Sequence, residues 1–229
     1  MSREGSLELL LEVEENLKTM KQTQQIRPVK VKSMLEHLRS SLEYVANDTY
    51  EKCVTPQPPI RPNIYFPYGE QKFIDNFFKQ KLNITPPSSS PLYEIFNSIQ
   101  DFRTGDNSLT IMCNLTNEVK HRQPIPLQEE KAIKDIKVSI DGVGFISGDC
   151  SSQIVFKGNY VNGQRIEDFT FKNGKLDRSG NGMPVNILIT EDKKIRFHGN
   201  DYEVIPFIES CITRFRIFIN AAYDVLEKI

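Results

Sequence analysis

Apolar side chains recur at helical spacing in two segments at the start of the chain. Over residues 4–24 the steps between apolar positions alternate between three and four residues, which is one face of an amphipathic helix: Leu10, Val13, Leu17 and Met20. A second stripe follows Pro28, which is tolerated in a first helical turn, and runs to about Cys53: Val31, Met34, Leu35, Leu38, Leu42 and Val45. Because only a short linker separates the two segments, the pattern predicts an antiparallel pair of helices.

The middle of the chain alternates between proline-rich connections and short helices. Residues 54–69 contain five prolines, so they form an extended connection and no regular element. Short apolar stripes then predict a helix around Phe73 to Phe78 and another from Leu92 to Ile99. A longer helix is expected from about Asn107 to Arg122, where Pro124 and Pro126 end it.

After about Ile136 the apolar positions alternate with a period of two, as in half-buried strands. Pairs that tolerate positive φ separate these stretches, which is typical of tight hairpins: Asp141-Gly142, Asn162-Gly163, Asn173-Gly174 and Gly199-Asn200. This region is therefore expected to form an antiparallel sheet of four to six strands.

From Pro206 onward helical spacing returns, with an unusually wide apolar face. One row alternates by three and four residues (Ile208, Cys211, Phe215, Phe218, Ala222, Val225 and Ile229), and a second row repeats every seven residues (Ile205, Ile212, Ile219 and Leu226). Either the helix packs between two helices of its own chain, or its second row packs against another subunit, which would make a homodimer.

Together these patterns predict an α+β protein in three parts. Residues 1–136 form the first part of a helical bundle, residues 137–201 an antiparallel β insertion, and residues 202–229 a C-terminal helix that packs back on the bundle.

Composition narrows the functional classes. The chain of 229 residues has 38% hydrophobic residues and a net charge of −1, so it is a globular protein and as a whole not a strongly basic nucleic-acid binder. Residues 26–39 nevertheless hold four cations against Glu36 alone, so a local site for an anionic ligand is possible.

Four scattered cysteines without a C-x-x-C pair predict reduced thiols, no metal site and no cofactor. An acidic start and the lack of a long apolar run predict a cytoplasmic protein without a membrane segment.

The helix that ends near Arg122 carries the clearest candidate chemistry. Asn114, Asn117 and His121 fall on one face at helical spacing, and Lys120 and Arg122 flank them. This cluster predicts a phosphate or RNA contact with His121 as a general acid or base. The alternative is structural, since His, Lys and Arg at a helix C-terminus stabilise the helix dipole. Walker, Rossmann, HExxH and GxSxG motifs are all absent from the sequence.

Two of these helices also carry a resemblance to a known group. The string LEHLRSSLEYV, residues 35–45, resembles the LRSALDHL helix of a widespread group of uncharacterised bacterial proteins. Phe66-Pro67, a short amphipathic helix and NLTNEVKHR, residues 114–122, then follow in the order in which that group has a Phe-Pro pair, a short helix and an LSNxDKHR motif. The group is similar to HEPN-type helical bundles, which often dimerise and frequently act on RNA in defence or toxin–antitoxin settings.

The resemblance has departures that bear on activity. Glu43 and Tyr44 replace Asp and His of the first motif, and Val119 replaces Asp of the second. HEPN ribonucleases have an Arg followed, four to six residues later, by a His, and no Arg of this chain precedes a His by that interval. The resemblance therefore implies a HEPN-like fold more than it implies an enzyme.

Three functional hypotheses follow. The first is a dimeric binding protein whose polar site contacts RNA, a nucleotide or another anionic ligand through Arg39, Asn117, Lys120, His121 and Arg122. The second is a metal-independent ribonuclease in which His121 and Arg39 are catalytic. In the third, the β insertion recognises a protein partner and the bundle is its scaffold.

Overall fold

The computed structural model describes residues 3–121, 125–140 and 144–229, except for a few side chains within these ranges. It divides into two compact units. Residues 1–127 and 197–229 form what we call the helical unit, and residues 128–196 form the β unit. Helices and antiparallel strands together confirm the α+β class.

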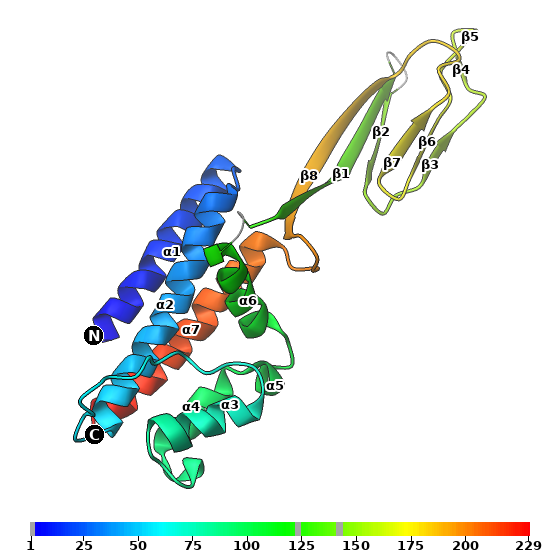
Figure 1. The fold of residues 1–229 in the computed structure, drawn as a ribbon. Coiled ribbons are helices and arrows are strands. Elements are labelled where there is room, and N and C mark those ends of the chain that lie inside the picture. The colour runs from blue at the N-terminus through cyan, green and yellow to red at the C-terminus, as the bar shows by residue number, and fades with distance from the viewer. Residues whose placement is uncertain (1–2, 122–124, 141–143) are drawn as a thin grey trace. The chain divides into compact units, whose positions relative to one another are not determined.

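Three long helices form the frame of the helical unit: α1 (Arg3–Thr23), α2 (Pro28–Cys53) and α7 (Val204–Leu226). Each of them packs against the other two, and they lie side by side in Figure 1. The stripes predicted from the sequence are largely buried, since Leu10, Leu38 and Phe215 have at most 2% of their surface exposed. The exception is Ile229 at the end of the predicted row, which lies beyond α7 and is 58% exposed. α7 thus packs between two helices of its own chain, which is the first of the two alternatives for its wide face.

Shorter helices cover one end of this frame. They are α3 (Gln71–Asn76) with its π-helical extension (Phe77–Lys81), a 3-10 turn (Pro87–Ser89), α4 (Pro91–Ser98), α5 (Asp101–Thr104) and α6 (Ser108–His121). Their aromatic residues pack on α7 in one cluster. Phe96 stacks on Phe66 and Phe77 with ring centroids 5.5 Å apart, and Phe218 meets Phe66 and Phe96 edge-on at 5.4 and 5.5 Å.

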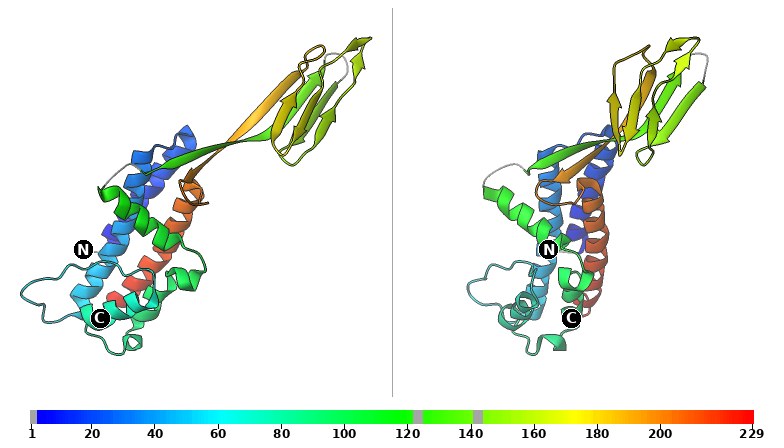
Figure 2. Two further views of the ribbon diagram at one scale, coloured as in Figure 1. Left: turned by 45° about the vertical axis from the view of Figure 1, so that its right-hand side comes forward. Right: turned by 90° about the vertical axis from the view of Figure 1, so that its right-hand side faces the viewer.

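The β unit contains two three-stranded antiparallel sheets and a small hairpin. One sheet has the order β2-β1-β8 (Gly144–Asp149, Leu127–Ile140 and Asn186–Phe197), and the other has the order β3-β6-β7 (Ile154–Phe156, Phe169–Lys172 and Lys175–Arg178). β4 (Tyr160–Val161) and β5 (Gln164–Arg165) form the hairpin. Figure 2 shows these strands from two further sides. The core of the unit takes side chains from both sheets, including Val138 of β1 and Phe171 of β6.

Two of the predicted hairpin turns are confirmed. Asn162-Gly163 joins β4 to β5 and Asn173-Gly174 joins β6 to β7, and all four residues have positive φ between 50° and 76°. Asp141-Gly142 lies outside the described residues. The expectation of one sheet with four to six strands was wrong, because the short strands bury Phe169 and Phe171 by facing a second sheet.

The sheet also begins earlier than the expected boundary between residues 136 and 137, because β1 starts at Leu127. The segment QEEKAIKD has little apolar alternation, so its strand character is not visible in the hydrophobic pattern. Charged pairs between β1 and β8 accompany it, with Lys193 Nζ 2.8 Å from Glu129 Oε1 and Arg196 Nη2 3.6 Å from Glu130 Oε2.

Candidate functional site

Arg39 of α2 and Asn117 of α6 meet in the helical unit. Arg39 Nη1 donates to Asn117 Oδ1 at 2.5 Å, to Thr116 Oγ1 at 2.9 Å and to the carbonyl oxygen of Cys113 at 3.1 Å. These contacts join the two segments that carry the LRSSL and NLTN strings. The arginine side chain keeps only 13% of its surface exposed, so its position is well defined by packing.

Glu43, one turn further along α2, links Arg39 to the proline-rich connection. Its Oε1 lies 3.4 Å from Arg39 Nε, and its Oε2 accepts a hydrogen bond of 2.6 Å from the backbone N–H of Phe66. Asn47 adds a second attachment, because its Nδ2 donates to the carbonyl oxygen of Ile64 at 3.3 Å. The connection is thus tied to α2, which holds the aromatic side chains around Phe66 beside the Arg39 cluster.

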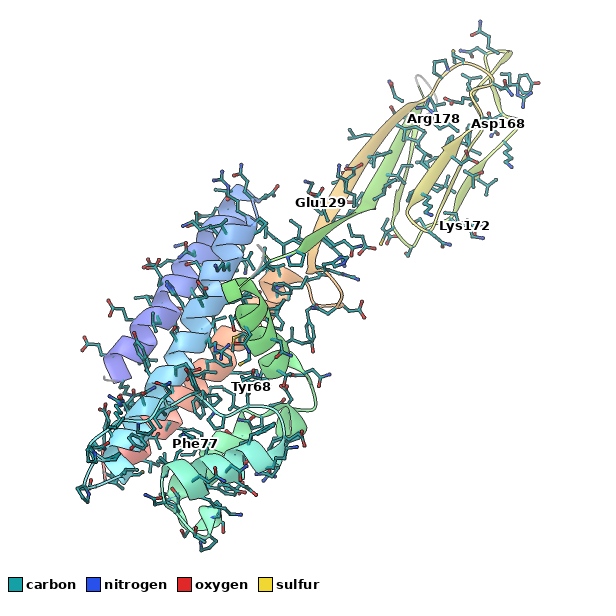
Figure 3. All side chains as sticks on the ribbon, viewed as in Figure 1. Tyr68, Phe77, Glu129, Asp168, Lys172 and Arg178 are labelled. Atoms are coloured by element: carbon teal, nitrogen blue, oxygen red, sulfur yellow. The ribbon has the colours of Figure 1, made fainter. Side chains whose placement is uncertain are left out.

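An apolar pocket of about 670 Å³ opens beside this connection. Its lining residues come from the connection and from α3 with its extension: Asn63, Tyr65, Phe66, Pro67, Tyr68, Phe73, Asn76, Phe77 and Lys81. Figure 3 labels Tyr68 and Phe77, which mark the two segments that line it. Phe66 and Phe77 are buried, whereas Tyr65 and Phe73 keep 64% and 46% of their surface exposed. The pocket therefore has a buried aromatic floor and accessible aromatic walls.

A second, smaller pocket of about 380 Å³ lies over the Arg39 cluster. Glu36, Arg39, Ser40, Glu43, Ile64, Tyr65 and Thr116 line it. Tyr65 lines both pockets, and the Tyr68 hydroxyl of the apolar pocket accepts a 3.1 Å hydrogen bond from Asn117 Nδ2 of the Arg39 cluster. The aromatic and the charged pockets therefore adjoin at Tyr65, and we call the two together the Tyr65 site.

The thiol of Cys113, the residue whose carbonyl oxygen accepts from Arg39, is buried. Burial raises the pKa of Cys113 to about 12, against a smaller opposing effect of the nearby Arg39 charge. The thiol is therefore protonated at neutral pH. In the described part of the chain, moreover, no group of His, Cys, Asp and Glu side chains is arranged to hold a metal ion.

Of the predicted site residues, Arg39 and Asn117 come together. The side chains of Lys120 and His121, and the whole of Arg122, lie outside the described residues. Among the described helices, none is long and apolar enough to cross a membrane.

Sequence reasoning missed the aromatic half of the site. Tyr65 and Tyr68 lie in the proline-rich segment, where no periodicity separates buried from exposed aromatics. Phe73 belongs to the apolar stripe that predicted α3, yet 46% of its surface is exposed. The one available signal is the density of the string NIYFPYG, which places Tyr65, Phe66 and Tyr68 within four residues in a segment with no apolar face of its own.

Comparison of the chain with protein-family models, with curated proteins and with solved structures finds no match. Its function must therefore be argued from the Tyr65 site itself.

Proposed function

We propose that the helical unit binds a short single-stranded RNA segment at the Tyr65 site, with a base in the apolar pocket and a phosphate at Arg39. The observation that carries the proposal is that the two pockets adjoin. Tyr65 lines both pockets, and the Tyr68–Asn117 hydrogen bond connects the aromatic walls with the arginine. A nucleotide unit has the same two parts, a flat apolar base and an anionic group.

The aromatic walls are suited to an unpaired base. Proteins recognise single-stranded RNA by stacking splayed-out bases on aromatic side chains, each worth about 1–3 kcal/mol. Tyr65 is exposed enough to offer a ring face, whereas Lys72 Nζ lies over the Phe73 ring, 5.2 Å from its centroid. A paired base is already stacked in its duplex, so the proposal is restricted to single strands.

Two cations are available for the phosphates on either side of that base. Arg39 Nη2 donates to no acceptor among the residues that the structure describes, so one end of the guanidinium can bind a phosphate oxygen. Lys81 lines the apolar pocket and forms no ion pair with any described side chain. Two contacts of this kind fit a net charge of −1, which disfavours a long electrostatic interface.

We also infer that the bundle is HEPN-like and that the protein works in a defence or toxin–antitoxin setting. The support is that both resembling strings, on α2 and α6, contact each other through Arg39 and Asn117. We also infer a homodimer. Its interface would not be the second apolar row of α7, because Ile212 and Ile219 are at most 5% exposed within the chain. A dimer through α7 would have to use the outer residues, of which Ile217 is 67% exposed. The ribonuclease alternative depends on His121, whose side chain lies outside the described residues.

The proposal can be tested by fluorescence anisotropy with a labelled single-stranded RNA of mixed sequence. Tyr65→Ala should weaken binding about tenfold because it removes a stacking surface, and Lys81→Gln should reduce the dependence of the affinity on salt. Tyr160→Ala is the matched control, since Tyr160 of the β unit is also 64% exposed and should leave the affinity unchanged. Equal affinities of the Tyr65→Ala and Tyr160→Ala variants, or no binding by the parent protein, would refute the proposal.

A further inference from the structure

The rim of the apolar pocket carries two amide side chains, Asn63 from the proline-rich connection and Asn76 from the end of α3. Both are exposed. Neither amide is hydrogen-bonded to another residue in the part of the chain that the structure describes. By contrast, Asn47, Asn97 and Asn117 all use their amides to hold other residues in place. Asn63 and Asn76 are therefore available to a ligand.

We infer that Asn63 and Asn76 read the base bound in the apolar pocket and that they favour adenine. This inference rests on the proposed function, because it assigns the specificity of the same site. It goes beyond RNA binding in naming which base the pocket selects and which residues select it.

An asparagine amide presents an acceptor oxygen beside a donor nitrogen, and its established partner is an adenine edge, with the N6 amino group beside a ring nitrogen acceptor. Adenine has such an acceptor on each side of N6, at N1 and at N7, and N6 carries two protons. Two amides from two different segments can therefore each pair with one side of the same adenine.

The other purine suits this rim less well. Guanine offers two acceptors, O6 and N7, on one edge and donors at N1 and N2 on another, and these donors call for a carboxylate. No Asp or Glu lines the apolar pocket among the residues that the structure describes. Lys81 is the rival reader, because a lysine can pair with O6 and N7 of guanine. The inference assigns Lys81 to a phosphate instead.

The test varies a single base in a fixed single strand. Labelled heptamers with three uridines on each side of a central A, C, G or U are titrated with the full chain, and the affinities are compared by anisotropy. The heptamer with the central adenine should bind about tenfold more tightly than the other three. Asn63→Ala and Asn76→Ala should each bring this preference for adenine down to about twofold or less. Asn181→Ala, at an exposed asparagine of the β unit, is the matched control and should preserve the full preference.

The outcomes separate the two proposals. If all four heptamers bind equally, RNA binding stands and the adenine inference is overturned. A preference for guanine that Lys81→Gln removes would overturn it as well, because Lys81 would then be the reader. If none of the heptamers binds, the proposed function itself fails and the adenine inference fails with it.

Discussion

A buried carboxylate in the β unit is held by more donors than a surface ion pair would have. Glu167 is 5% exposed, and both of its oxygens accept hydrogen bonds from Arg178, one of them at 2.9 Å from Nε. The hydrogen bond from Arg178 lowers the pKa of Glu167, with help from backbone N–H groups of Val185 and Gly180, and this outweighs the opposing effect of desolvation. The ionised Glu167 carboxylate therefore stabilises the folded β unit.

The stability of the β unit should consequently fall in acid. Because the pKa of Glu167 is lower in the folded state, its contribution is fully present above the unfolded value of about 4.3 and is lost as the pH falls through the folded value. Glu167→Gln should lower the melting temperature of the β unit by about 5 °C at pH 7, and this difference should be smaller at pH 3 than at pH 7. Differential scanning calorimetry at several pH values measures it, with Glu191→Gln, at an exposed glutamate of β8, as control. An equal difference at both pH values would contradict the assignment.

Half of the Tyr65 site could be predicted at the level of single residues. Arg39 and Asn117 lie on the polar faces of two helices whose apolar stripes are recognisable in the sequence. The helical period therefore predicted where these two residues lie on their helices. Tyr65 and Tyr68 depend instead on the course of the proline-rich connection. That course is set by long-range contacts such as the hydrogen bond between Glu43 and the N–H of Phe66, which no local pattern encodes.

Among the elements, α7 contains neighbouring positions that differ strongly in burial and therefore in how much a substitution should destabilise the protein. Phe218 is 2% exposed and packs on Phe66 and Phe96, whereas the adjacent Ile217 is 67% exposed. The sequence predicted the helix itself because its two rows keep strict spacing. The spacing could not decide whether the partner of the second row is α1 and α2 or another subunit.

These two neighbours provide a matched pair of variants. Phe218→Glu should destabilise the protein by about 4 kcal/mol or more, because it buries a charge and removes a ring from the aromatic cluster, while Ile217→Glu should change the stability by at most about 0.5 kcal/mol. Urea unfolding followed by circular dichroism measures both. The elution volume of the Ile217→Glu variant tests the homodimer as well, since a dimer through the outer face of α7 should become a folded monomer. A parent protein that already elutes as a monomer would rule that dimer out.

The whole molecule is a helical unit interrupted in sequence by a β unit. The chain leaves the helical unit and returns to it at neighbouring points, because the N–H of His198 donates to the carbonyl oxygen of Pro126 at 2.9 Å. Turn chemistry made the β unit recognisable in the sequence, through its Asn-Gly pairs. Its first boundary was placed about nine residues too late because the charged start of β1 lacks an apolar face.

Removal of the β unit should leave the helical unit folded. Replacing residues 128–196 with a short Gly-Ser linker closes a gap whose ends are already hydrogen-bonded neighbours, so little chain entropy opposes it. We expect the variant to keep its helical circular dichroism and its affinity for single-stranded RNA. A variant that aggregates or loses its helices would show that the helical unit depends on the β unit. If the variant binds RNA but loses a protein partner that the parent captures, the partner-recognition hypothesis for the β unit gains direct support.

The interruption also constrains how the chain acquires its structure during synthesis. α7 supplies core residues to α1 and α2, yet the whole β unit is translated between α2 and α7. While the ribosome is making the β unit, the apolar stripes of α1 and α2 have no third helix to cover them, whereas the β unit can form from its own continuous segment. The β unit of the nascent chain can therefore fold first, and the helical unit is completed only when α7 has left the exit tunnel.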